Sequence, residues 1–265
     1  MPSTVWYTAA AVLFFVPTFA ASASFGPASG IRSNAASQLT GCDILIRAGL
    51  SGQIFFSNDT EYDVTIQSYY SGDVQDVRPS CILKPTTSQQ VSDAIKSLNS
   101  EALGCWTVAI RSGGHSPFPS NNAANGVTID LGGINSISYM EKPDSPGHGV
   151  AALGPGGRWS EVYSALEEQG VMTTGGREGH VGVGGFLLGG GKAKSQLNHE
   201  YGSKSCGKCS ANSVFAKVVL ANGSLIEANA TAHADLFKAL KGGMNCRFPY
   251  YRGISSNRGL TKRLI

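Results

Sequence analysis

Glycine is unusually dense near the middle of the second half of this chain, where six of the ten residues from Gly182 to Gly191 are glycine. A Rossmann dinucleotide loop needs the pattern G-x-G-x-x-G and a long helix after it. Leu187 stands where the third glycine is required, and a helix would break at the triplet that ends the segment. The segment therefore excludes a nicotinamide-type fold, and it predicts backbone packed against a flat, partly apolar ligand.

A second glycine-rich loop, 111–116, directly follows an expected strand at 106–111. Gly113 and Gly114 allow the backbone to approach a ligand closely, and successive N–H groups in such a loop can form a concave anion site. Ser112 and Ser116 add hydroxyl donors. A pyrophosphate suits this arrangement, although an ordinary turn explains the loop equally well when it is taken alone.

The rest of the pattern predicts an α+β or mixed α/β domain without internal repeats. Apolar residues recur at helical spacing in two segments that begin at Thr87 and at Trp159, and the second is expected to end at Gly170. Thr87 and Gln90 form a candidate capping box. A last short helix is expected at 234–241. The expected strands are 106–111, 127–131, 149–153, 215–220 and 225–228, the last two joined as a hairpin.

The N-terminus has the features of an export signal. Residues 5–20 are apolar and uncharged, and Ala21-Ser22-Ala23 has the form of a cleavage site, so residues 1–23 are expected to be a signal peptide. A membrane anchor is the alternative, but Pro17 interrupts the short apolar run. The protein is therefore expected to be secreted, with no membrane segment in the mature chain.

Other features agree with export. Six cysteines permit disulfides, and three glycosylation sequons begin at Asn58, Asn222 and Asn229. The net charge of +3 is too small to indicate a nucleic-acid partner.

Five motifs occur in a fixed order along the chain, and together they resemble a known family. They are Arg111-Ser112-Gly113-Gly114-His115-Ser116, Val127-Thr128-Ile129-Asp130-Leu131, Gly182 to Gly191, Val218-Val219-Leu220-Ala221-Asn222-Gly223, and Asp235 to Gly243. This order resembles the PCMH-type FAD-binding domain of the vanillyl-alcohol oxidase and p-cresol methylhydroxylase superfamily. The similarity is greatest to fungal berberine-bridge-enzyme-like oxidases, and it runs from about Cys42 to Gly243.

The resemblance implies an α+β fold of two α+β subdomains with FAD between them. The expected organisation is an N-terminal segment at 24–76, the FAD-binding domain at 77–247 and a divergent basic tail at 248–265. The family continues after Gly243 into a substrate-binding domain, which is missing here, so the chain is expected to be C-terminally truncated.

Cofactor-binding residues also follow from the resemblance. The loop from Arg111 to Ser116 would hold the pyrophosphate, and His115 matches the histidine that bonds covalently to the flavin. Cys42 and Cys105 resemble a disulfide pair of the family, and no metal is expected. The residues that would line the flavin are Gly182, Val183, Gly184, Gly185, Leu188, Gly189, Gly190 and Gly191.

The chain departs from the family at a second covalent attachment point, a cysteine shortly after a Tyr-Gly pair. Tyr201-Gly202 is present, but Cys206 and Cys209 both lie out of the expected register. Either cysteine could bond to the flavin; a local disulfide or free thiols remain open. Half of a zinc site is the weakest alternative, because no second ligand pair has suitable spacing.

The resemblance implies a secreted, monomeric oxidase. FAD would accept a hydride at N5 from an alcohol, sugar or amine carbon of a small-molecule substrate, and O₂ would reoxidise it. No catalytic base is assigned, because Asp130, Tyr163 and His180 have structural explanations in a strand end, a helix stripe and a loop. The alternatives are a truncated non-catalytic remnant that binds FAD weakly or not at all, and a secreted structural domain without flavin.

Overall fold

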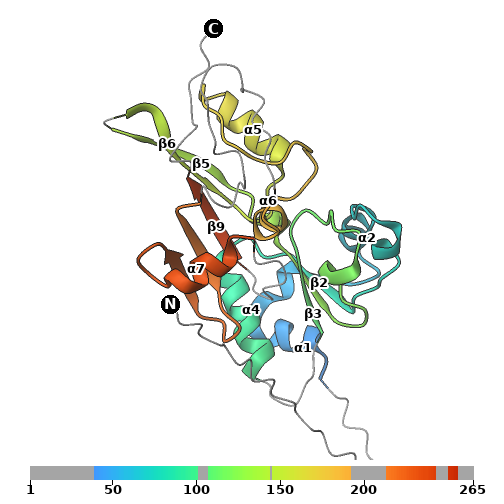
Figure 1. Ribbon diagram of the computed structural model, residues 1–265. Helices are drawn as coiled ribbons and strands as arrows, with labels where there is room; N and C mark the ends of the chain where they lie inside the picture. Colours follow the sequence, from blue (N-terminus) through green and yellow to red (C-terminus); the bar gives the residue numbers. More distant parts are fainter. Residues whose placement is uncertain (1–38, 101–106, 144, 192–212, 243–249, 256–265) are drawn as a thin grey trace, which may run out of the picture. The chain divides into compact units, whose positions relative to one another are not determined.

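The computed structural model describes residues 39–100, 107–143, 145–191, 213–242 and 250–255 (Figure 1). These residues form two β-sheets with helices packed against them, so the expected α+β fold is confirmed. No helix in these ranges is long and apolar enough to cross a membrane. The expected signal peptide lies outside the described residues.

The first sheet has four strands in the order β1-β2-β4-β3. β2, β4 and β3 are parallel, and β1 is antiparallel to β2. The register pairs Arg111 with Asp130, so β3 and β4 both end at the same edge of the sheet. The strands are β1 (Ile54–Phe55), β2 (Cys81–Leu83), β3 (Val108–Arg111) and β4 (Val127–Asp130).

The second sheet has five antiparallel strands in the order β5-β6-β9-β7-β8. The hairpin of β7 and β8 was predicted, and its turn places Gly223 in the left-handed region with φ of +79°. The strands are β5 (Ile137–Lys142), β6 (Ser145–Leu153), β7 (Phe215–Val219), β8 (Leu225–Asn229) and β9 (Tyr250–Ser255).

Seven α-helices surround these sheets within the described ranges. The helices beginning near Thr87, Trp159 and Ala234 confirm the sequence prediction, and Gly170 follows the second of them with φ of +67°. The helices are α1 (Gly41–Leu45), α2 (Thr60–Gln67), α3 (Gly72–Gln75), α4 (Ser88–Ser100), α5 (Trp159–Glu167), α6 (Val183–Leu188) and α7 (Ala234–Leu240).

Helix α4 joins the two sheets. Its apolar stripe, which includes Val91, Ala94 and Leu98, is buried in one cluster with residues of α1, β2, β4 and β7. On the side of the second sheet, Ser92 Oγ donates a hydrogen bond to the carbonyl of Gly223 at 2.5 Å. Figure 1 shows α4 beside α1.

The capping of α4 differs slightly from the predicted box. Thr87 Oγ1 accepts the N–H of Gln90 at 3.2 Å, as expected. The side chain of Gln90, however, accepts from the N–H of Thr86 at 2.8 Å rather than from that of Thr87. The second of the two hydrogen bonds of the capping box therefore reaches one residue further back than in the standard motif.

One disulfide joins the N-terminal helix to the first sheet, between Cys42 of α1 and Cys81 at the start of β2. The expected pairing of Cys42 with Cys105 is therefore wrong. Helix α1 packs into the same buried cluster as β2, which brings the two Cα atoms to 6.1 Å, within disulfide range. Cys105, Cys206 and Cys209 lie outside the described residues.

Candidate functional site

The loop after β3 meets the segment before α6 through direct backbone contact. A β-carbon built on Gly113 would lie 2.5 Å from the Cα of Gly182, and one built on Gly182 would lie 2.6 Å from the Cα of Gly113. Only glycine at both positions permits this approach. The two glycine-rich motifs that the sequence singled out are therefore parts of one site.

A third loop, at 154–158, completes the junction. Ser112 Oγ donates to the carbonyl of Pro155 at 2.5 Å, and the N–H of Gly184 donates to the same carbonyl at 3.2 Å. Arg158 Nη1 donates to the carbonyl of Gly113 at 3.2 Å and also to the carbonyl of His180. Arg158 thus links the first glycine-rich loop to the residue that lies two positions before the second glycine-rich segment.

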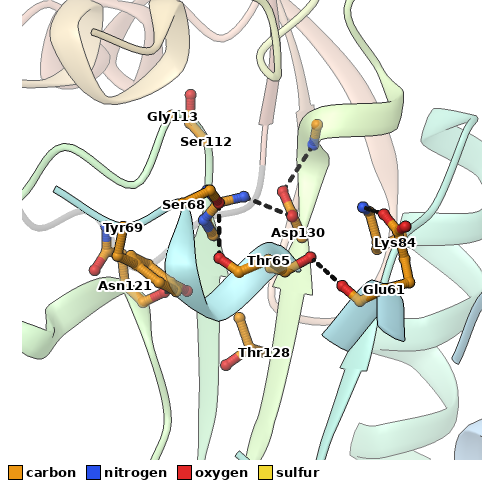
Figure 2. A network of polar contacts seen from close by, with 12 residues as sticks. Glu61, Thr65, Ser68, Tyr69, Lys84, Ser112, Gly113, Asn121, Thr128 and Asp130 are labelled. Atoms are coloured by element: carbon orange, nitrogen blue, oxygen red, sulfur yellow. Dashed lines mark hydrogen bonds and ion pairs between the residues drawn. The ribbon is translucent and has the colours of Figure 1, made fainter. Parts of the chain in front are cut away.

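A buried ion pair supports the loop from beneath. Arg111 Nη1 lies 2.6 Å from Asp130 Oδ2, with side-chain exposures of 5% and 2%. Arg111 Nη2 donates to Ser68 Oγ at 2.6 Å, and the guanidinium lies 4.6 Å from the centre of the Tyr69 ring. Figure 2 shows Ser68 and Asp130 below Ser112 and Gly113 in this view.

These contacts define what Arg111 does. Its guanidinium lies within the fold, and it is absent from the residues that line the cavity described below. Burial raises the pKa of the Tyr69 phenol, against the opposing effect of the Arg111 cation. Asp130, which the sequence placed at a strand end, serves as the counter-ion and also accepts the N–H of Gly132 at 2.9 Å.

The loop presents a run of unpaired donors above this support. Within the described part of the chain, no acceptor pairs with the backbone N–H groups of Gly113, Gly114, His115 and Ser116. Gly113 and Gly114 are buried residues, and Gly114 has φ of +67°. Because buried backbone donors are nearly always paired, the N–H groups of Gly113 and Gly114 indicate that this loop binds an acceptor, and an anion such as a pyrophosphate would supply it.

A cavity of about 730 Å³ opens beside this loop. Its volume lies in the range of cofactor sites. Histidine and tyrosine rings offer flat surfaces, and Arg158 offers a cation. The residues that line the cavity are Ser68, Tyr70, Gly113, His115, Arg158, Glu178 and His180. These residues fit a ligand that has both a diphosphate and a flat ring system.

The second glycine segment divides between two places. Gly182, Val183 and Gly184 lie at the junction with the first loop. At the other end, Gly190 packs against Gly242, and a β-carbon on Gly191 would meet the ring of Phe186. Helix α6 separates the two ends, so the structure brings only the first part of the segment to loop 111–116.

The sequence did not identify four residues that line the cavity: Ser68, Tyr70, Arg158 and Glu178. Arg158 directly precedes the helical stripe of α5, a position that could have suggested a role at the helix start. Of the residues that the sequence left without a catalytic role, His180 lines the cavity. Tyr163, which lies on α5, is not among the lining residues and donates a hydrogen bond to the carbonyl of Gly176 at 2.6 Å.

Comparison with known proteins agrees with this site. The FAD binding domain family matches residues 79–229, more than half of the chain. The FAD-dependent monooxygenase sdcF of Emericella nidulans is 34% identical over 205 residues, 77% of this chain and 40% of the relative. The FAD-dependent monooxygenase yanF of Aspergillus niger is 34% identical over 248 residues, 91% of this chain and 39% of the relative.

A solved structure of a berberine bridge enzyme variant in complex with (S)-reticuline superposes with a TM-score of 0.65 at 25% identity. The match covers 84% of this chain and 43% of that one. The chain thus spans about two fifths of the length of the relatives it matches. The family match includes the three loops that form the junction, and the chain belongs to the FAD-linked oxidoreductases with a PCMH-type FAD-binding domain.

Proposed function

We propose that loop 113–116 binds the pyrophosphate of FAD and that His115 bonds covalently to the flavin. The run of unpaired N–H groups from Gly113 to Ser116 carries this proposal, because a diphosphate supplies acceptors to several donors at once. Arg158, which lines the same cavity, adds positive charge beside it. His115 belongs to the same donor run and lines the cavity in which the ring would bind.

The covalent bond would join an imidazole nitrogen of His115 to the 8α carbon of the flavin. Forming this bond would remove one proton from the nitrogen, and one proton and an electron pair from the carbon. FAD would accept the electron pair, and O₂ would take it up with the two protons as H₂O₂. A neutral imidazole near pH 7 is a competent nucleophile for such a bond.

For the whole protein we propose oxidation of a small-molecule alcohol, sugar or amine. When bound, FAD supplies the chemistry, taking a hydride at N5 and passing the electrons to O₂. The described residues hold the cofactor, and no substrate base is assigned to them. H₂O₂ formation on a panel of alcohols, oligosaccharides and amines tests this reaction; substrate consumed without H₂O₂ would contradict it.

We further propose that the protein is secreted and glycosylated as a monomer. Two of the sequon asparagines, Asn58 and Asn222, are exposed in turns of the described chain. Peptide mapping of protein from the culture medium would test this, since glycans at these asparagines require passage through the secretory pathway.

Absorption spectra before and after acid precipitation test the FAD proposal. The protein is purified, incubated with FAD and precipitated, and we expect flavin bands to remain with the precipitate. His115→Ala should lose the covalent flavin, whereas His180→Ala, which alters another histidine of the same cavity, should keep it. A colourless precipitate from the unmodified protein, or retained flavin in His115→Ala, would overturn covalent attachment at His115.

A further inference from the structure

Three consecutive residues after α2 contact the loop that carries His115. Ser68 Oγ accepts from Arg111 Nη2, and the ring of Tyr69 lies below the same guanidinium. The N–H of Tyr70 donates to the carbonyl of Gly114 at 3.0 Å. The segment Ser68–Tyr70 therefore follows the loop residue by residue, from its buried base to its ligand-facing end.

The side chain of Tyr70 ends this series on His115. The two rings are stacked, with centroids 4.2 Å apart and planes 19° from parallel. Tyr70 is 67% exposed, so burial in a core does not determine where its ring lies. Both rings line the cavity, and the backbone bond to Gly114 fixes the tyrosine beside the histidine.

We propose that Tyr70 is a positioning residue that sets the plane of the His115 imidazole for bonding to the flavin. This inference rests on the proposed role of His115. The torsion that rotates an imidazole about its Cβ–Cγ bond has broad minima, so a histidine in an open cavity needs an external contact to fix its plane. A ring stacked on one face supplies that contact.

The stack leaves the reactive part of the imidazole free. The nitrogen lone pair lies in the plane of the ring, whereas Tyr70 covers a face. Attack on carbon therefore proceeds from the ring edge while the phenol ring limits rotation. Orientation of this kind raises the rate of bond formation, because fewer of the histidine rotamers are unproductive.

Three variants separate positioning from a general structural effect. Tyr70→Leu removes the stacked ring, and Tyr70→Phe keeps the ring without the hydroxyl. Phe118→Leu is the matched control, because Phe118 is a similarly exposed aromatic residue, at 71%, near the same loop. All three should retain the thermal unfolding midpoint of the unmodified protein, since both side chains are largely exposed.

The first readout is the NMR signal of His115 in the full chain without FAD. A ring stacked on the imidazole shifts its C–H protons upfield. Tyr70→Leu should move these protons downfield towards the values of a free histidine, and Tyr70→Phe and Phe118→Leu should leave them in place. Unchanged His115 signals in Tyr70→Leu would overturn the inference, whether or not the protein takes up flavin.

The second readout is the rate at which FAD becomes resistant to acid precipitation. We expect Tyr70→Leu to slow attachment by about tenfold or more, as loss of orientation does in other reactions. Tyr70→Phe should restore the rate. Equal rates in Tyr70→Leu and the unmodified protein would refute the role of Tyr70, whereas covalent flavin in His115→Ala would refute the role of His115 itself.

Discussion

The backbones of Gly113 and Gly182 lie so close that neither residue has room for a β-carbon. The contact joins the loop after β3 to the residue that caps α6, and so connects an element of the first sheet to a helix packed on the second. The position of the donor run from Gly113 to Ser116 depends on this contact. Its loss should therefore affect both stability and cofactor binding.

Gly182→Ala tests the contact. The added methyl group would overlap backbone atoms that cannot move aside as a flexible side chain could, so we expect a loss of about 1–3 kcal/mol in unfolding free energy. Gly185→Ala is the control, because Gly185 lies in the helix that Gly182 caps and has no atom within 4 Å of the added carbon. That change should stabilise the protein by about 0.5–1 kcal/mol. Urea unfolding measures both, and equal effects would contradict the contact.

The buried pair of Arg111 and Asp130 supports the second prediction. Asp130→Asn removes the counter-ion of a buried guanidinium and should cost about 3–5 kcal/mol of unfolding free energy. Lys84→Gln breaks the more exposed pair with Glu61, whose side chains are 24% and 44% exposed, and should cost about 1 kcal/mol or less. Similar losses in the two variants would show that the buried pair contributes no more than the exposed one.

Much of this site could be predicted from the sequence because clustered glycines in loops indicate a close approach of the backbone to a ligand. One such loop, 111–116, directly follows a strand. The other, the glycine run at 182–191, does not match the Rossmann pattern. The pairing of the two loops through Gly113 and Gly182 could not be predicted, because it depends on how β3 and α6 pack.

The residues that support loop 111–116 could not be predicted from the sequence either. Ser68 and Tyr70 lie in an unremarkable polar segment, and only the fold brings them to Arg111 and His115. The disulfide was predicted wrongly. The pairing of Cys42 with Cys105 came from the resemblance to the family, whereas the packing of α1 against the start of β2 determines the partner of Cys42 in this chain.

Alkaline pH should destabilise the protein partly through Tyr69. Burial raises the pKa of its phenol above the ordinary value of 10.0, so the folded chain keeps the proton after the unfolded chain has begun to lose it. The contribution of Tyr69 is complete below about pH 10 and is lost as the pH rises towards the folded pKa. Between about pH 9 and about pH 11, the unfolding free energy of Tyr69→Phe should therefore fall by less than that of the unmodified protein.

Unfolding free energies at several pH values measure this difference. Burial also raises the pKa of Tyr62 and Tyr139, so the decline in Tyr69→Phe should be smaller but still present. Tyr69→Phe also loses the hydrogen bond from the phenol to the carbonyl of Asn121, which lowers stability equally at every pH below 10. Parallel curves for the two proteins would show that Tyr69 ionises as readily in the folded chain as in the unfolded one.

The disulfide between Cys42 and Cys81 gives the last prediction. It closes a loop with a sequence separation of 39, and its loss should cost about 2–5 kcal/mol of unfolding free energy. Cys42→Ala should therefore unfold at lower urea concentration than the unmodified protein under oxidising conditions, and reductant should remove most of the difference between them. Cys105→Ala is the matched control, because the bond that the structure contains should persist in it. Peptide mapping without reduction should recover Cys42 linked to Cys81 in this control; a peptide of Cys42 linked to Cys105 in the unmodified protein would refute the pairing.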